Sequence, residues 1–188
     1  ITESVPAEQG SADWTLPWID SRQFTVKAKG YASNGMLVAA DERLYGFRPL
    51  TMADRTADGI YLDLYDPKHQ RLYVQKDGRI TKAYLSSSSR NFMWRPPNVH
   101  PREEHDHAGV FRVIAKERTH WSTIFNVPMH YAMRYVGGHY IHATTPNHYD
   151  TLGGPASGGC NRLTVEDARE LYSQTPVGTR VEVIGPDG

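Results

Sequence analysis

The sequence has only one cysteine among its 188 residues, no long hydrophobic run and no net charge. A single cysteine excludes an intramolecular disulfide and argues against a cysteine-based zinc site. No stretch approaches the roughly 18 consecutive apolar residues of a membrane-spanning helix, so we expect no membrane-spanning segment. The 21 basic residues balance 21 acidic ones, which leaves no net field to attract nucleic acid. We therefore expect no nucleic-acid partner.

The length and the 39% hydrophobic content are those of one main domain with a sizeable core. Residues 1–57 have no sustained hydrophobic period, so we predict an N-terminal extension of short elements. We expect it to pack on the main domain through Trp14, Trp18 and Phe24. Alternation of apolar and polar residues begins at Ile60, and we assign residues 58–188 to the main domain. The chain opens with Ile1 and shows no signal-peptide pattern, so we expect a targeting segment to have been removed.

The main domain has the pattern of a mainly β structure with one clear helix. Asp77-Gly78 suits the tight turn of a hairpin, and Gly137-Gly138 suits a second one. Thr164 is a candidate N-cap for a helix over residues 165–173. Between the strands, residues 86–108 combine four serines, prolines, histidines and acids without a period, which predicts a long loop or lid. The expected strands cover residues 60–65, 71–75, 79–85, 109–114, 129–136, 139–143 and 180–184.

Glycine is concentrated around the only cysteine, in the run that ends Gly158-Gly159-Cys160. Glycine removes side chains that would obstruct a substrate and leaves backbone N–H groups available to an oxyanion. A cysteine that only fills a core, which is the competing interpretation, needs no such setting. Thiol chemistry near neutral pH also needs a base within reach, and the chain has nine histidines as candidates.

The spacing of His142 and Cys160 resembles the L,D-transpeptidase catalytic domain. That family carries a histidine at a strand end, a loop, and then Ser/Thr-His-Gly-Cys followed two positions on by Asn or Arg. His142 lies 18 positions before Cys160. The segment 106–113 resembles the family's Thr-Pro-x-Gly-x-Phe element, and residues 178–181 resemble its last strand. Two departures are Gly158, where the family usually has histidine, and Asp106-His107-Ala108 in place of Thr-Pro.

The resemblance covers about residues 60–184 and implies an L,D-transpeptidase-type β-sandwich with one or two short helices. It implies that Cys160 attacks the bond between the third residue and D-alanine of a tetrapeptide stem, with His142 as base. An amine of a second stem would resolve the thioester, forming a 3→3 cross-link or exchanging the terminal D-alanine. The partners would be peptidoglycan stem peptides in the periplasm or cell envelope, with roles in cell-wall biogenesis and cell shape.

The resemblance also assigns supporting roles around this pair. The carbonyl of Ala143 would orient His142, and the N–H groups of Gly158, Gly159 and Cys160 would bind the oxyanion. Arg162 would clamp a substrate carboxylate, although a solvated or salt-bridged arginine is an equal alternative. Further candidates for substrate contact are Ser157, for which a structural role is the stronger alternative, and Tyr140.

Other functions stay open at this stage. An L,D-carboxypeptidase or amidase of the same fold would use water instead of an amine, and Gly158 leaves room for a non-catalytic peptidoglycan-binding module. His100, His105 and His107 lie among acidic residues and superficially suggest a metal site. Their spacing fits no defensible ligand motif, so we expect no metal and no cofactor.

Overall fold

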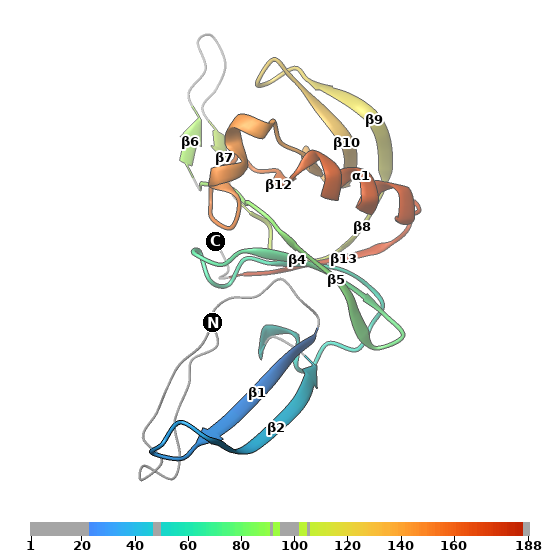
Figure 1. Ribbon diagram of the computed structural model, residues 1–188. Helices are drawn as coiled ribbons and strands as arrows, with labels where there is room; N and C mark the ends of the chain where they lie inside the picture. The colour runs from blue at the N-terminus through green and yellow to red at the C-terminus, as the bar shows by residue number, and fades with distance from the viewer. Residues whose placement is uncertain (1–22, 47–49, 91, 95–101, 105, 186–188) are drawn as a thin grey trace. The chain divides into compact units, whose positions relative to one another are not determined.

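A computed structural model describes residues 23–46, 50–90, 92–94, 102–104 and 106–185 of the chain, which forms two compact units, residues 1–48 and 49–188. The first unit contains an antiparallel hairpin of β1 (Gln23–Tyr31) and β2 (Leu37–Gly46) (Figure 1). Its turn uses Gly35 at a φ of 82°. The prediction of short elements in this part of the chain is wrong for these two strands, which have nine and ten residues. Trp14 and Trp18 lie outside the described residues, and a 1–57 extension packed on a 58–188 domain stays a prediction.

A five-stranded sheet forms the base of the second unit, in the order β5-β4-β3-β13-β8. The strand β13 lies between β3 and β8 and runs parallel to β3 and antiparallel to β8. Asp77 and Gly78 adopt φ values of 51° and 69°, which confirms the predicted tight turn. The strands are β3 (Gly59–Asp63), β4 (Arg71–Lys76), β5 (Arg79–Leu85), β8 (Gly109–Arg112) and β13 (Arg180–Ile184).

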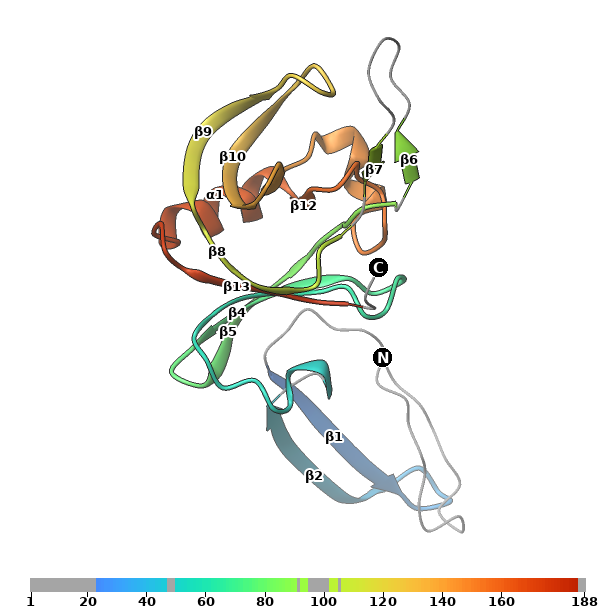
Figure 2. The same ribbon diagram turned by 180° about the vertical axis from the view of Figure 1, so that it is seen from behind.

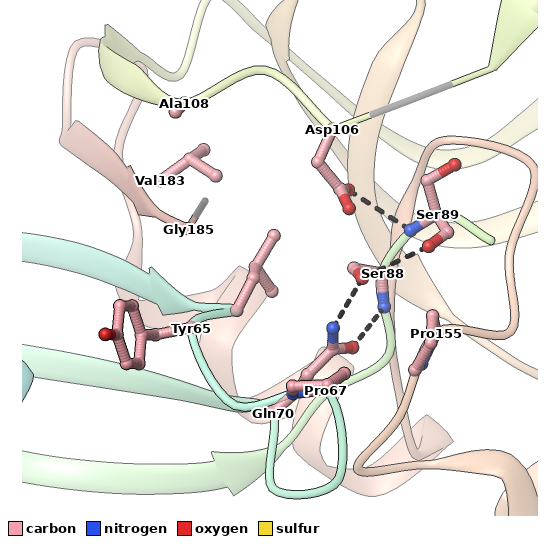
Figure 3. Close-up of a pocket in the computed structure, with 11 residues that line it drawn as sticks. Tyr65, Pro67, Gln70, Ser88, Ser89, Asp106, Ala108, Pro155, Val183 and Gly185 are labelled. Carbon is pink, nitrogen blue, oxygen red and sulfur yellow. Dashed lines mark hydrogen bonds between the residues drawn. The ribbon is translucent and has the colours of Figure 1, made fainter. Parts of the chain in front are cut away.

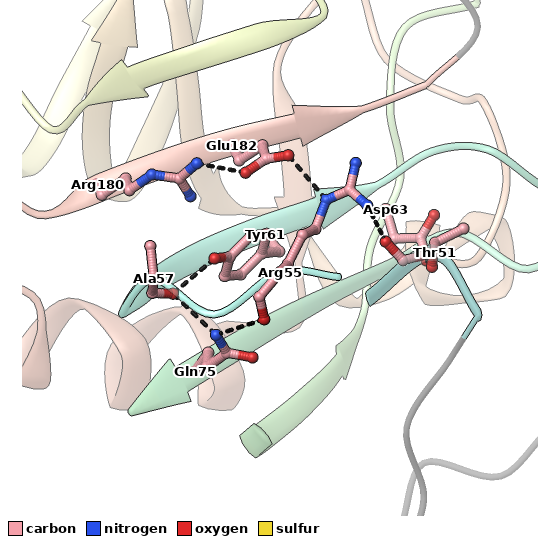
Figure 4. A network of polar contacts seen from close by, with 8 residues as sticks. All are labelled: Thr51, Arg55, Ala57, Tyr61, Asp63, Gln75, Arg180 and Glu182. Atoms are coloured by element: carbon pink, nitrogen blue, oxygen red, sulfur yellow. Dashed lines mark hydrogen bonds and ion pairs between the residues drawn. The ribbon is translucent and has the colours of Figure 1, made fainter. Parts of the chain in front are cut away.

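The segment 50–58 covers one face of this sheet (Figure 4). Tyr61 donates from its hydroxyl to the carbonyl of Ala57 at 2.6 Å, and Gln75 donates from Nε2 to the same carbonyl at 2.9 Å. Arg55 pairs with Glu182 across the surface at 2.8 Å. All five residues of β3 are therefore buried, although the sequence of this strand alternates as if one face met water.

A four-stranded sheet in the order β12-β11-β10-β9 forms the second layer. The edge strand β12 runs parallel to its neighbour β11, and the other neighbouring strands run antiparallel. The predicted hairpin around Gly137-Gly138 is confirmed, while the strand before it was missing from the prediction. The strands are β9 (Ala115–Ser122), β10 (Val127–Val136), β11 (His139–Ala143) and β12 (Asn161–Leu163).

The helix α1 (Val165–Gln174) follows the second sheet. Thr164 caps it as predicted, because its side chain accepts from the N–H of Asp167 at 3.1 Å. At the other end Lys116 donates from Nζ to the carbonyls of Tyr172 and Thr175 at 2.6 and 2.5 Å. Short 3-10 turns occur at Leu50–Met52 (η2) and Pro146–Thr151 (η3). No helix within the described ranges has the length and apolarity needed to cross a bilayer.

One hydrophobic core joins both sheets and α1. Leu62 and Val181 enter it from the five-stranded sheet, Ile141 and Leu163 from the four-stranded sheet, and Leu171 from α1. Figures 1 and 2 show β9 and β10 curving away from the layer of β4, β5 and β13. The expected mainly β sandwich with one or two short helices is confirmed.

The segment 86–108 differs from the predicted long loop. Ser86 to Ser89 are buried, with exposed fractions of 0–1%. Two of them form bridges, Ser87 to Arg162 of β12 and Ser89 to Ser157 in the loop before it. A small antiparallel hairpin of β6 (Phe92–Trp94) and β7 (Arg102–Glu104) follows. His100 and His105 lie outside the described residues. The serines are therefore part of the fold beside Cys160.

Candidate active site

Cys160 lies directly before β12 at the edge of the four-stranded sheet. Its side chain is partly exposed and packs against a small apolar cluster of Met129, Ala132 and Tyr140. The sulfur lies 3.9 Å from the carbonyl oxygen of Gly138. The thiol is thus supported from below by apolar groups and remains accessible to solvent.

The register of β11 and β12 puts His142 and Cys160 on one face of the sheet. In this parallel pair Ile141 lies beside Asn161, and His142 lies beside Arg162. Ile141 belongs to the shared core, and alternation along the strand turns His142 to the opposite face. The same alternation turns Arg162 away from the fully buried Asn161. Cys160, directly before β12, packs against Tyr140, which lies on the same face of β11 as His142. His142 and Arg162 therefore lie side by side on one face of the sheet, and the thiol lies on this face directly before β12.

His142 is held in one orientation by the backbone. Its Nδ1 lies 2.8 Å from the carbonyl oxygen of Ala143. A carbonyl only accepts hydrogen bonds, so Nδ1 carries the hydrogen and the lone pair of the neutral ring is on Nε2. Burial lowers the pKa of His142 to about 4, and the positive charges of Arg162 and the nearby histidines act in the same direction. At neutral pH the ring is an uncharged base.

Two hydrogen bonds shape the glycine-rich loop. The N–H of Gly159 donates to Oγ of Ser157 at 3.0 Å, and Nδ1 of His139 donates to the carbonyl of Gly159 at 2.6 Å. Gly159 adopts a φ of 125°, a conformation that favours glycine. Ser157 is 1% exposed, so its hydroxyl orders the loop. Of the three predicted oxyanion donors, Gly159 gives its N–H to Ser157, and the oxyanion role of the N–H groups of Gly158 and Cys160 stays a prediction.

Arg162 and Tyr140 border the thiol on the same face. Arg162 donates from Nη2 to the carbonyl of Ala156 at 2.9 Å. Burial lowers the pKa of its guanidinium, which the nearby Cys160 opposes. Tyr140 is 7% exposed and stacks on the ring of His120 at a centroid distance of 4.7 Å. Tyr140 therefore forms part of the floor around Cys160.

The opposite side of the loop contains residues that the sequence prediction missed. Asn161 donates from Nδ2 to the hydroxyl of Tyr135 at 2.9 Å, and burial raises the pKa of this phenol. The rings of His107 and His139 meet edge to face at 4.6 Å. His107 belongs to the segment Asp106-His107-Ala108, which stands in place of the family's Thr-Pro. This resemblance was the one signal in the sequence that the segment reaches the site.

A cavity of about 120 Å³ lies between Gln70, Ser88, Asp106 and Val183 (Figure 3). Gln70 and Ser88 exchange hydrogen bonds of 2.7 and 2.9 Å in its wall, and Asp106 accepts from the N–H of Ser89 at 3.1 Å. Neither Cys160 nor His142 lines it, so it is separate from the candidate site. Within the described part of the chain, no group of three or more His, Cys, Asp or Glu side chains is arranged to hold a metal ion.

A two-sheet β-sandwich with a thiol and a buried imidazole on one sheet face is the class of structure that this chain adopts. The family model for the L,D-transpeptidase catalytic domain matches residues 59–183. The chain therefore belongs to the L,D-transpeptidase family. No curated protein matches its sequence.

Solved structures of L,D-transpeptidases have the same fold. The enzyme from Xylanimonas cellulosilytica is 25% identical with a TM-score of 0.61, over 73% of this chain and 65% of that one. The enzyme from Stackebrandtia nassauensis is 23% identical with a TM-score of 0.56, over 72% and 61%. L,D-transpeptidase 3 from Mycobacterium tuberculosis, in complex with a faropenem-derived adduct, is 22% identical with a TM-score of 0.51, over 68% and 60%. The chain thus spans less than two thirds of the length of each.

Proposed function

We propose that this chain is a peptidoglycan L,D-transpeptidase that works through a thioester on Cys160. The observation that carries the proposal is the 2.8 Å hydrogen bond from His142 to the carbonyl of Ala143. It fixes the tautomer whose Nε2 can accept a proton, on the sheet face that also carries the thiol. Family membership supports the reaction class, and the partial exposure of Cys160 suits attack on a large substrate.

In the acylation step, Nε2 of His142 takes the thiol proton and the sulfur of Cys160 attacks the carbonyl carbon of the third stem residue. The N–H groups of Gly158 and Cys160 stabilise the oxyanion. The bond to D-alanine then breaks, and the imidazolium returns the proton to the leaving amine. The products are a thioester and free D-alanine.

In the second step, an amine of another stem peptide gives its proton to His142 and attacks the thioester. The new amide is a 3→3 cross-link, or an exchanged D-amino acid when the acceptor is a free amino acid, and the thiol is restored. Arg162, two residues after the nucleophile, is the proposed clamp for the substrate carboxylate. Because Nη2 already donates to the carbonyl of Ala156, the other N–H groups of the guanidinium would bind the substrate carboxylate.

The proposed setting is the periplasm or cell envelope, where peptidoglycan stems occur. Incubation with disaccharide-tetrapeptide, followed by mass spectrometry, tests the function. Dimers containing a 3→3 bond are the expected product, and the Cys160→Ser protein is the matched control. Tripeptide without dimers would replace the proposal by a carboxypeptidase, and an unchanged substrate would replace it by a binding module.

A further inference from the structure

Phe125, on the turn between β9 and β10, touches the loop of the candidate site. A Cβ atom added at Gly158 would lie 2.4 Å from Cζ of Phe125 and 3.1 Å from each Cε. The ring tip therefore fills the space that a side chain at position 158 would need. Gly158 stands where the resembling family usually has histidine. In this chain an aromatic ring from another strand pair takes that space.

The obstacle to a side chain at Gly158 is the ring and not the backbone. Gly158 lies outside the left-handed region, unlike Gly159 at a φ of 125°. The turn that carries Phe125 is itself ordered, because the N–H of Phe125 donates to Oγ of the buried Ser122 at 3.3 Å. The ring is 39% exposed, so one side meets Gly158 and another meets solvent.

We propose that Phe125 is a positioning residue that holds the backbone at Gly158 in place, so that the N–H of Gly158 can bind the oxyanion. The inference rests on the proposed function, in which the Gly158 N–H is a donor. The hydroxyl of Ser157 and the ring of His139 fix the following residue, Gly159. Contact with Phe125 restrains the loop one residue earlier, so its removal loosens the donor.

The test is a double-mutant cycle of Phe125→Ala and Gly158→Ala. Each single change breaks the same contact, the first by removing the ring and the second by displacing it. We expect each to slow acylation by a carbapenem about tenfold, with the double variant slowed about tenfold and not a hundredfold. Phe125→Leu should keep most of the rate, and Ile124→Ala, a neighbouring apolar residue on the same turn, should keep all of it. Independent, multiplying effects would overturn the pairing.

Alkylation of Cys160 by iodoacetamide separates positioning from other roles. This reaction forms no oxyanion, and Cys160 is the only thiol, so the alkylation rate of each variant should stay within about twofold of wild type. An equal fall in both rates would mean that Phe125 acts on the thiol, and a rise in both would mean that it only blocks access. Either result overturns the proposal.

Thermal unfolding keeps this test distinct from the proposed function. Each single variant should lower the midpoint by about 2–4 °C, and the double variant by the same amount rather than twice as much. A wild-type protein that is alkylated but never acylated would refute acyl transfer and the positioning role with it. The steric pairing would then stand if the midpoints are non-additive and fall if they are additive.

Discussion

His139 and Gly159 are joined by a 2.6 Å hydrogen bond from the imidazole Nδ1 to the carbonyl oxygen. His142, three residues further along β11, makes the corresponding bond to Ala143 at 2.8 Å. The odd spacing puts the two rings on opposite faces of the strand. Of these two histidines, His142 shares the face of Cys160, whereas His139 contacts the loop from the opposite face of the strand. The two histidines therefore have separable roles that mutation can distinguish.

Replacing Cys160 with serine should abolish turnover of the tetrapeptide substrate and leave the fold intact. A hydroxyl is nearly isosteric with the thiol but far less ionised. Product formation followed by mass spectrometry gives the rate, and circular dichroism gives the folded fraction. A folded serine variant with wild-type turnover would contradict the role of the thiol as nucleophile.

A carbapenem should form a covalent adduct with Cys160. Attack of the sulfur on the strained lactam carbonyl breaks the ring C–N bond, and the added mass equals that of one intact drug molecule. Intact-protein mass spectrometry should find one adduct on the wild type and none on Cys160→Ser. An unchanged mass after long incubation would argue against an active thiol.

Local signals in the sequence predicted much of the fold. Asp77-Gly78 predicted its hairpin, and Thr164 predicted the start of α1, because a turn or a cap depends on a few adjacent residues. The strand β9 was missed because Lys116, Glu117 and Arg118 interrupt any alternation on this edge strand. The β1–β2 hairpin was missed although Asn34-Gly35 is a hairpin signal, since alanine and glycine dilute the pattern of β1.

The candidate site was only partly accessible from sequence. The resemblance selected His142 and Cys160, but the register that puts them on one face depends on parallel pairing of β11 with β12. Ser88 looked like part of a polar loop, yet it is buried because Gln70 pairs with it on both its N–H and its hydroxyl. Phe125 was missed because its contact with Gly158 depends on how a distant hairpin curves.

Protonation of His142 should make the fold less stable in mild acid. Burial lowers the pKa of His142 from 6.5 to about 4. Between these two pH values, His142 is therefore protonated in the unfolded chain and neutral in the native state. The contribution of His142 to the free energy of unfolding is complete above pH 6.5. It falls as the pH approaches 4, by up to about 3 kcal/mol.

Urea unfolding of wild type and His142→Gln between pH 4 and 7.5 measures this effect. The difference between the two proteins isolates His142 from the carboxylates, which titrate in both. The glutamine variant should lose less stability on acidification. If the free energies of unfolding of the two proteins changed in parallel with pH, His142 would have an ordinary pKa in the native state.

Removing the hydroxyl of Tyr135 should destabilise the sheet beneath the site. The fully buried Asn161 donates to that hydroxyl at 2.9 Å, and Tyr135→Phe leaves the amide without its acceptor. The expected loss is about 1–3 kcal/mol in the free energy of unfolding, measured by urea denaturation. Tyr65→Phe, at a 67% exposed side chain, is the matched control and should change it by less than about 0.5 kcal/mol. Equal effects at the two positions would refute a structural role for the Asn161 bond.

His142→Ala should slow acylation of Cys160 by roughly two to four orders of magnitude at pH 7, the usual range for loss of a general base. Without the imidazole the thiol titrates near its ordinary pKa of about 8.5, so only a few per cent is thiolate at pH 7. Part of the rate should return as the pH rises toward 9, because hydroxide then ionises the thiol.

His139→Ala is the matched control: it loosens the loop, so it should lower the rate by a factor that stays constant with pH. Acylation by a carbapenem from pH 6 to 9.5, with circular dichroism on each variant, measures both profiles. A folded His142→Ala protein that acylates at the wild-type rate at pH 7 would transfer the role of base to another histidine.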